Sequence, residues 1–191
     1  MSEQFRRPTH AVRVGRTAIG GDNPIRIQSM TNTPTLDTKA SARQTVSIAR
    51  AGADLVRLTA QGVSHARNLA AIRDAVRAEG CDVPLVADIH FNPAAAFEAA
   101  LHVEKVRINP GNFVDPGRTF KKLEYTDEEY AAELSRIDEK LTPFLELCRE
   151  HGTALRIGVN HGSLSDRIMS RYGDTPAGMV ESAMEFLRIC E

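Results

Sequence analysis

The 191-residue chain is long enough for one sizeable core, and its 42% hydrophobic and 26% charged residues are typical of a globular protein, which excludes the disordered and fibrous classes. The formal net charge of −1 excludes a general electrostatic attraction to nucleic acid or membranes, so any anion must be bound by locally placed charge. The 24 basic residues are 19 Arg and 5 Lys, and arginine is suited to two-pronged contact with carboxylate or phosphate.

Residues 1–24 contain no apolar stretch resembling a secretion signal, and no run in the chain approaches the length that crosses a bilayer. The three cysteines, Cys81, Cys148 and Cys190, are far apart and form no C-x-x-C pair. Their odd number indicates a reducing compartment such as the cytoplasm. We expect them to be buried fillers of the core rather than metal ligands.

A β-hairpin is predicted first, starting near Val12, with its turn at Gly15-Arg16 or Gly20-Gly21; it would cap the lower end of the structure. Strand-like runs and helical patterns then alternate strictly. The strands are expected at 25–31, 54–60, 83–90, 105–111 and 154–160. The helices are expected at 38–53, 64–80, 92–102, 126–152 and 176–191, with Ser64 and Thr126 as N-caps and Gly52, Gly80 and Gly152 near C-terminal ends. No motif is assigned to the long connection over 112–130.

Strict alternation indicates a parallel sheet, which could be doubly wound or part of a (β/α)8 barrel. In every strand the polar side chains occupy alternate positions, as in Arg57 and Thr59, and the positions between them are mostly aliphatic. One face is therefore polar, whereas a doubly wound sheet is apolar on both faces. A whole barrel needs about 250 residues. We expect the α/β class with an incomplete TIM-type (β/α)8 barrel over 25–191, preceded by the hairpin cap over 1–24.

Three arginines, Arg57, Arg107 and Arg156, each lie in the later part of a strand, toward the C-terminal mouth where barrels form their active sites. At about 6 Å separation and an effective dielectric near 20, each pair would repel by roughly 3 kcal/mol, and Asp88 could offset only part of this. A shared phosphate or diphosphate would relieve the repulsion. The alternative is that each arginine pairs with a carboxylate in the interior.

Polar segments follow the strands, and their backbone N–H groups suit anions or hydroxyls. Asp88 and His90 lie two residues apart and share a face, so they could transfer protons, bind a substrate hydroxyl or form a hydrogen-bonded interior pair. Metal ligation by this pair would need further ligands, which nothing in the sequence marks. His161 is a further candidate for lining the site.

The segments IRIQSMTNTPTLD, ADLVRLTAQG, PLVADIHFNPAAA, KVRINPGN and LRIGVNHGSL together resemble the N-terminal barrel of the 4-hydroxy-3-methylbut-2-enyl diphosphate synthase family, in its long form. The resemblance implies an oxidoreductase of isoprenoid biosynthesis, in the methylerythritol phosphate pathway. Its reaction would be the reductive ring opening and dehydration of 2-C-methyl-D-erythritol 2,4-cyclodiphosphate, with electrons from ferredoxin or flavodoxin. It also implies diphosphate-binding arginines at Arg57, Arg107 and Arg156 and pocket positions at Asp88, Asn109 and Asn160.

The resemblance further implies a [4Fe-4S] cluster on a C-terminal domain, a homodimer in which that domain closes over the partner's barrel, and a bacterial cytoplasmic or plastid-like location. The cluster ligands, that domain and the last three barrel strands have no counterpart in this sequence. We therefore expect a fragment without reductase activity of its own, which covers its open sheet edges by association with itself or another chain.

Two alternatives stay open at this point. One is a dihydropteroate-synthase-like barrel that binds a pterin and a diphosphate ester. The other is a phosphate-binding module without chemistry.

Overall fold

The computed structural model describes residues 7–114 and 124–191, and its centre is a five-stranded parallel sheet in the order β3-β4-β5-β6-β7. These strands are β3 Gln28–Met30, β4 Leu55–Ala60, β5 Leu85–Ile89, β6 Lys105–Ile108 and β7 Ala154–Ile157. Each strand pairs in parallel with the next one along the chain, as strands joined by helical crossovers do.

Helices join successive strands and continue after the last one. They are α1 Thr38–Arg50, α2 Val63–Ala78, α3 Pro93–Ala100, α4 Pro110–Phe113, α5 Asp127–His151, the 3-10 helix η1 His161–Ser163, α6 Asp166–Tyr172 and α7 Pro176–Cys190. Within the ranges that the structure describes, no helix is both long and apolar enough to span a membrane.

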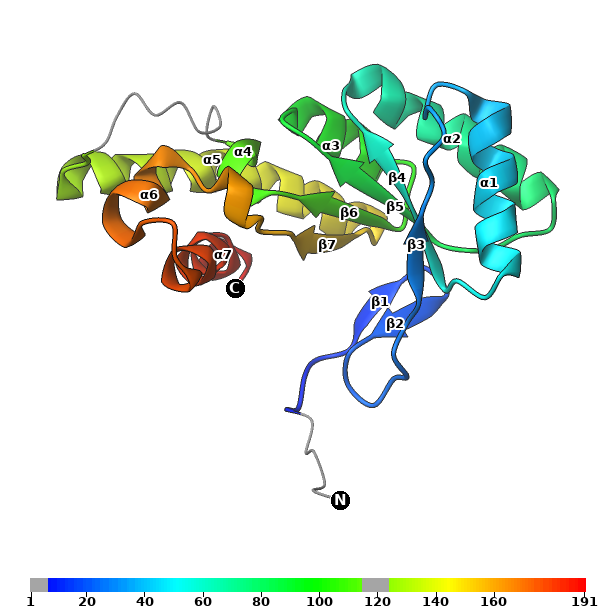
Figure 1. Ribbon diagram of the computed structural model, residues 1–191, viewed down its shortest axis with the longest axis horizontal. Helices are drawn as coiled ribbons and strands as arrows, with labels where there is room; N and C mark the ends of the chain where they lie inside the picture. Colours follow the sequence, from blue (N-terminus) through cyan, green and yellow to red (C-terminus); the bar gives the residue numbers. More distant parts are fainter. Residues whose placement is uncertain (1–6, 115–123) are drawn as a thin grey trace.

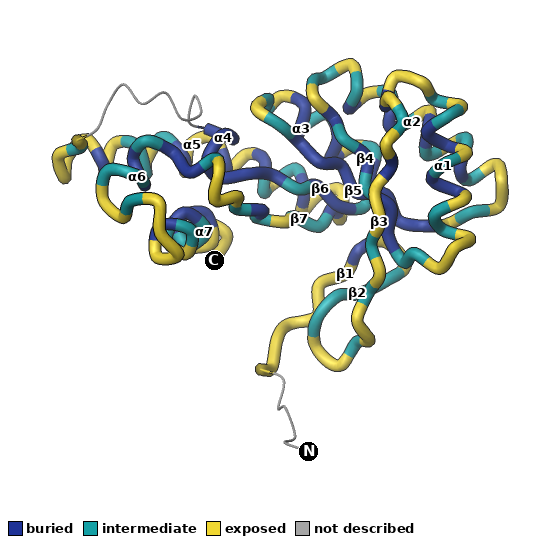
Figure 2. Tube along the Cα trace, in the orientation of Figure 1, coloured by how far each residue is buried: buried dark blue, intermediate teal, exposed yellow. Residues whose placement is uncertain are grey.

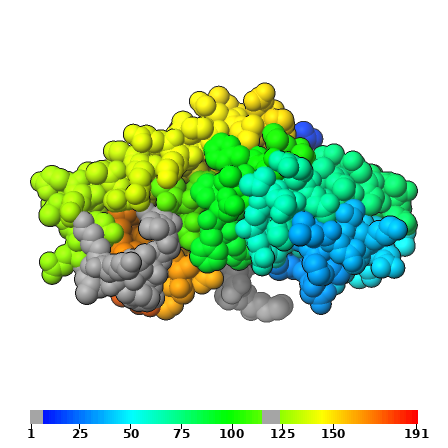
Figure 3. All heavy atoms as spheres, turned by 90° about the horizontal axis from the view of Figure 1, so that it is seen from above, coloured from blue at the N-terminus to red at the C-terminus, as the bar shows by residue number. Residues whose placement is uncertain are grey.

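The sheet is open, with β3 and β7 at its two edges. Figure 1 shows α1, α2 and α3 on one side of it, and in Figure 3 the blue and cyan segments lie at one end of the molecule and the yellow-green and orange segments toward the other. The prediction of an α/β fold with an incomplete barrel is therefore confirmed.

The aliphatic positions of the strands face the helices, as the alternation predicted. Val56, Leu58, Val106 and Ile108 are completely buried in the main hydrophobic core, together with residues of α1, α2, α3, α5 and α7. In Figure 2 the dark blue of buried residues is concentrated in the central strands β4, β5 and β6, whereas the edge strands β3 and β7 are mostly teal or yellow. The opposite side of the sheet, which we call the inner face, carries the polar positions.

The hairpin closes the lower end of the inner face. Its strands, β1 Val12–Val14 and β2 Thr17–Ile19, pair antiparallel around a turn at Gly15-Arg16, the first of the two predicted turns. Val14 is fully buried against Leu55 and Val86 in a second, small core, which Ile19 and Ala154 also contact. These partners lie near the N-terminal ends of their strands, so the hairpin packs against the lower end of the sheet.

Several predicted boundaries were wrong, mainly because polar residues after the strands begin new helices. Asn109 and Asn160 were expected to continue β6 and β7, but each is the N-cap of a short helix, α4 and η1. Helix α2 has Gly62 as its N-cap instead of Ser64. Thr126 does cap α5, in a complete capping box with Glu129. The predicted connection over 112–130 lies partly outside the described residues, at 115–123.

Helix α6 was not predicted, and it contributes a buried ion pair. The Arg167 guanidinium donates to both carboxylate oxygens of Glu185, at 2.6 and 2.5 Å, and the Tyr130 hydroxyl donates to the same carboxylate. Arg167 and Glu185 are 2% and 3% exposed. Burial is the largest influence on the Tyr130 hydroxyl and raises its pKa. The pair joins α5, α6 and α7 through one buried carboxylate.

Replacing Arg167 alone should destabilise the chain strongly. Arg167→Met leaves the Glu185 carboxylate buried without its counter-charge, which costs about 3–5 kcal/mol, whereas the double variant with Glu185→Leu should recover most of the loss. Urea unfolding measures both. Arg50→Met is the control, because Arg50 and its partner Glu79 are both exposed and such pairs contribute about 1 kcal/mol or less. Equal losses in Arg167→Met and Arg50→Met would contradict the assignment.

Candidate functional site

The centre of the inner face is the carboxylate of Asp88, the last residue but one of β5. It is 2% exposed, and it lies between two arginines from the neighbouring strands. Arg57 contacts one of its oxygens at 3.1 Å, and Arg107 contacts the other at 3.1 Å. The parallel register of the strands produces these two contacts. Arg107 is level with Asp88 on β6, and Thr59, two residues after Arg57, is level with it on β4. Two of the three predicted arginines therefore converge on one acidic residue.

Arg107 depends on a glycine of β7's C-terminal extension. Its second terminal nitrogen donates to the Gly158 carbonyl at 2.5 Å, and its side chain lies across the Gly158 backbone. A methyl carbon added at Gly158 would be 2.2 Å from Arg107 Nε, well inside contact distance. Gly158 is thus needed for the space that Arg107 occupies, rather than for an unusual backbone angle.

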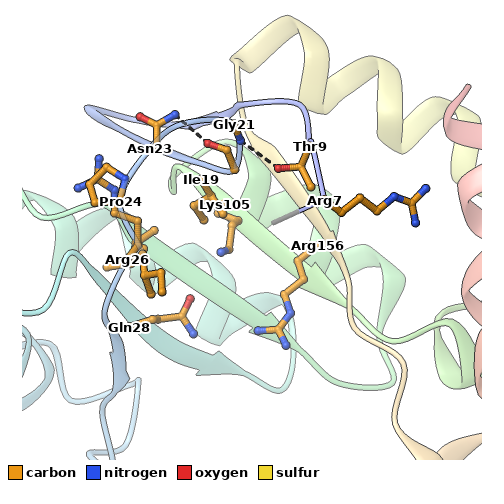
Figure 4. A pocket seen from close by; sticks show the side chains of 13 residues that line it. Arg7, Thr9, Ile19, Gly21, Asn23, Pro24, Arg26, Gln28, Lys105 and Arg156 are labelled. Carbon is orange, nitrogen blue, oxygen red and sulfur yellow. Dashed lines mark hydrogen bonds between the residues drawn. The ribbon is translucent and has the colours of Figure 1, made fainter. Parts of the chain in front are cut away.

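Arg156, the third predicted arginine, shares the inner face but not the Asp88 carboxylate. It lines a cavity of about 490 Å³ with Lys105 and Gln28, beneath the loop that follows the hairpin. Figure 4 shows the Lys105 and Arg156 side chains extending from the sheet into this space, below Gly21 and Asn23. Among the described residues, no carboxylate lies within ion-pair distance of Arg156 or Lys105.

Lys105 was missed at the sequence level. It is the first residue of β6, two positions before Arg107 and hence on the same face, and it is 7% exposed. Burial is the main cause that lowers the pKa of its ammonium group, and repulsion from Arg156 and Arg57 lowers it further. The strand alternation that identified Arg107 and Asn109 pointed equally to Lys105, so this signal was present in the sequence.

The inner face therefore carries a surplus of positive charge. Four cationic side chains, those of Arg57, Lys105, Arg107 and Arg156, lie on the same face as the Asp88 carboxylate, and of these only Arg57 and Arg107 contact it. The one negative charge of Asp88 offsets only one of these positive charges. The face therefore favours a ligand with more than one negative charge.

His90 lies beside Asp88 as predicted. Its Nε2 is 3.2 Å from the Asp88 carboxylate, and its side chain is 38% exposed. The next residue, Phe91, has a positive φ of 56°, which is uncommon for a non-glycine residue, and its side chain is exposed. Asp88 and His90 thus form a hydrogen-bonded pair, which was one of the possibilities that the sequence offered. The imidazole also reaches solvent.

The predicted asparagines are engaged in local structure. Asn109 accepts from the Gly111 amide and donates to the Ser163 hydroxyl at 2.7 Å, which ties the segment after β6 to the segment after β7. Asn160 accepts from the Gly162 amide. His161 lies away from Asp88, paired with Asp174 at 3.0 Å. These contacts give both asparagines a structural role, and their place in a substrate pocket stays a prediction.

A second polar cavity of about 380 Å³ lies at the C-terminal ends of β3 and β4. It is lined by the two polar segments predicted there, through Thr31, Asn32, Thr33, Pro34, Thr35, Thr59, Gln61 and His65. The Thr31 hydroxyl and the His65 Nδ1 are buried without a hydrogen-bond partner. The individual residues of this cavity were not named from the sequence.

The described residues do not form a metal centre. None of their His, Cys, Asp and Glu side chains gather in a group of three that could hold a metal ion. The cysteines are unpaired and lie in three environments, with Cys148 buried, Cys81 partly buried and Cys190 exposed. The prediction of buried fillers is right for Cys148, whose pKa burial raises to about 11, and wrong for Cys190. An iron–sulfur cluster does not fit these residues.

Replacing Gly158 should disrupt the Asp88 cluster. Gly158→Ala forces the Arg107 side chain away from Asp88, and overpacking of this kind costs about 1–3 kcal/mol. Thermal unfolding and a crystal structure of the variant measure the two effects. Gly162→Ala is the control in the same segment, since its added methyl carbon would meet only Asn160, at 3.7 Å. An Arg107–Asp88 contact still at 3.1 Å in Gly158→Ala would refute the expectation.

Comparison with known proteins points to relatives that are about three times as long. The chain is 66% identical over 185 residues to the 4-hydroxy-3-methylbut-2-en-1-yl diphosphate synthase (flavodoxin) of Bacteroides fragilis, covering 97% of this chain and 30% of the relative. It is 58% identical over 184 residues to the enzyme of the same name from Akkermansia muciniphila, covering 96% of this chain and 31% of the relative. The chain thus spans just under a third of the length of these curated relatives.

Among solved structures, a dihydropteroate synthase of Xanthomonas albilineans in complex with indole-2-carboxylic acid and 6-chloroguanine aligns with a TM-score of 0.46 at 16% identity, over 94% of this chain and 72% of that one. The domain family described as GcpE TIM-barrel domain matches residues 9–191. Because this match covers nearly the whole sequence, the chain belongs to the GcpE TIM-barrel domain family.

Proposed function

We propose that this chain is the substrate-binding barrel part of an oxidoreductase that converts 2-C-methyl-D-erythritol 2,4-cyclodiphosphate to (E)-4-hydroxy-3-methylbut-2-enyl diphosphate. Relatives with 58–66% identity carry the name of that synthase. Such identity over almost the whole chain supports a shared role for this part of the protein. The reaction opens the cyclic diphosphate reductively and eliminates water.

The observation that carries the proposal is the surplus of positive charge on the inner face. Arg57 and Arg107 share one carboxylate, while Lys105 and Arg156 have no acidic partner among the described residues. A diphosphate supplies both the missing negative charge and oxygen atoms arranged for the forked guanidinium donors. A neutral ligand would leave the repulsion in place.

Each site residue has a task in this proposal. Arg57, Arg107 and Arg156 bind the diphosphate oxygens, and Asp88 holds the first two guanidinium groups in place. His90, hydrogen-bonded to Asp88 and open to solvent, is placed to donate to a substrate oxygen. Asn109 and Asn160 shape the segments after β6 and β7, from which they would line the pocket. We assign no catalytic group to the chain itself.

The remaining parts of the proposal concern the whole protein. We propose that its [4Fe-4S] cluster is held outside the residues described here, because their three cysteines lie in three separate environments. The name of the relatives supports flavodoxin as the electron donor, with ferredoxin as the alternative. We also propose a homodimer in the cytoplasm, since the edge strands β3 and β7 leave unpaired backbone groups in this chain.

Diphosphate should stabilise the chain. At a concentration about 100 times the dissociation constant, a ligand stabilises the folded state by about 2.7 kcal/mol, which raises the melting temperature by roughly 5–10 °C at this length. Arg57→Ala and Arg107→Ala should each reduce the rise, because each removes a charged hydrogen-bond donor. Differential scanning fluorimetry with diphosphate measures the shift.

Arg43→Ala provides the matched control for this experiment, since Arg43 is exposed on α1 and far from Asp88 in the fold. It should leave the diphosphate shift unchanged. A pterin serves as the control ligand, because tight binding of pterin would support the dihydropteroate-synthase-like alternative. The same shift in the wild type, Arg57→Ala and Arg107→Ala would sink the proposal.

The activity test uses the whole protein that contains this chain. Arg107→Ala should lower kcat/KM for the cyclic diphosphate about 10- to 100-fold, which corresponds to the loss of one charged hydrogen bond of about 1.5–3 kcal/mol. Arg43→Ala should leave kcat/KM unaltered. The 191-residue chain by itself should show no turnover. Turnover by this chain alone would show that a part outside it is not required.

A further inference from the structure

The cavity between the hairpin and the sheet contains a buried cation without a partner. Lys105 is 93% buried, given its 7% exposure, and it lines the cavity of about 490 Å³. Lysine is almost never buried to this extent unless its ammonium group is paired. Among the described residues, no hydrogen-bond acceptor and no carboxylate contacts the Lys105 ammonium group. The volume is in the range of about 300–1,000 Å³ that small-molecule sites occupy.

The other charged groups of the cavity do not supply a counter-ion. Arg156 extends into the same space (Figure 4) and carries the same charge. Arg26 also lines the cavity, but it is held at the wall, where it donates to the Ala18 carbonyl at 3.0 Å and pairs with Asp54 at 3.4 Å. Asp54 is therefore already used, and none of the residues that line the cavity is acidic.

Neutral hydrogen-bonding groups complete the walls. The Gln28 side chain comes from β3 and lies across from Arg156 in Figure 4, while Thr9, in the segment before β1, and Gly21, in the loop after β2, lie above them. The Thr9 hydroxyl already accepts from the Gly21 amide at 3.0 Å. Besides Arg26 and Arg7, which also line the cavity, Lys105, Arg156 and the Gln28 amide are thus available to a ligand, and the Thr9–Gly21 hydrogen bond fixes the wall above them.

We propose that this cavity binds a phosphoryl oxyanion between Lys105 and Arg156, so that Lys105 is an additional recognition residue of the site. The inference rests on the proposed function and deepens it: one phosphoryl group of the diphosphate lies below the Asp88 cluster, near the hairpin, and not at Arg57 and Arg107 alone. An ammonium and a guanidinium group from adjacent strands neutralise such an oxyanion from two sides.

The experiment titrates inorganic phosphate and, separately, diphosphate into the 191-residue chain by calorimetry. Lys105→Gln removes the charge and should weaken binding of both anions at least about tenfold, as expected for the loss of a charged hydrogen bond. Lys105→Arg keeps the charge and should retain most of the affinity. Lys140→Gln is the matched control, because Lys140 is an exposed lysine of α5 and its replacement changes the net charge equally.

Circular dichroism shows whether Lys105→Gln folds. If it does not, Lys105→Met takes its place, because methionine keeps the apolar part of the side chain without the charge. This variant too should bind phosphate and diphosphate more weakly. A crystal grown with selenate should show the anion within hydrogen-bond distance of the Lys105 ammonium and the Arg156 guanidinium groups. Anion density at Asp88 alone would overturn the inference. So would wild-type affinity in both neutral variants.

The outcomes also separate this inference from the proposed function. If Arg57→Ala loses diphosphate affinity while Lys105→Gln binds like the wild type, the diphosphate site stands and the role of Lys105 falls. If the wild-type chain binds neither anion, both fail. A third outcome is that the chain binds phosphate through Lys105 but does not bind diphosphate. The cavity of Lys105 and Arg156 would then be a site for free phosphate, and the cyclic diphosphate would be rejected as its ligand.

Discussion

The shared carboxylate of Asp88 is the interaction on which the inner face depends. It is nearly inaccessible to water and contacts Arg57, Arg107 and His90. At these distances and an effective dielectric near 20, each arginine gains about 5 kcal/mol of Coulomb attraction before the cost of desolvation. Without the carboxylate, the two guanidinium groups would face each other from β4 and β6, on either side of β5. Asp88 therefore makes it possible to keep both cations on one face and available to a ligand.

The single carboxylate of Asp88 cannot neutralise all the positive charges of the inner face. The hairpin increases the energetic cost of this excess charge, because it buries part of the face. By packing Val14 against Leu55 and Val86, the hairpin closes the lower end of the inner face and buries these residues. Lys105 lies beside this small core and is buried as a result. A cation in a half-closed, water-poor space is stabilised much more by an anion than the same cation on an open surface. The packing of the hairpin thus favours the proposed ligand, because it buries Lys105 and an anion stabilises this buried ammonium group.

Much of this could be predicted from the alternation of polar and aliphatic residues. Side chains of a strand alternate between two faces, so Arg57, Asp88 and Arg107 had to share one side if the strands were parallel. The helical side of the sheet followed from the same rule. Lys105 obeyed it too and lay within the predicted strand over 105–111, but it is the first residue of β6, and the candidates were taken from the later part of each strand. The roles of Asn109 and Asn160 as helix N-caps depended on short helices that have too few residues for a periodic pattern.

The sequence by itself determined the strand–helix alternation, the polar face and the surplus of arginine, because these depend on residue type and on spacing along one element. Only the tertiary structure decided which charges meet. The register between strands places Asp88 between two arginines, and the passage of Arg107 over Gly158 joins residues 51 positions apart. The position of the hairpin creates the cavity that Arg156 and Lys105 line, apart from the Asp88 carboxylate. Such pairings depend on distances between elements, which no single segment of the chain contains.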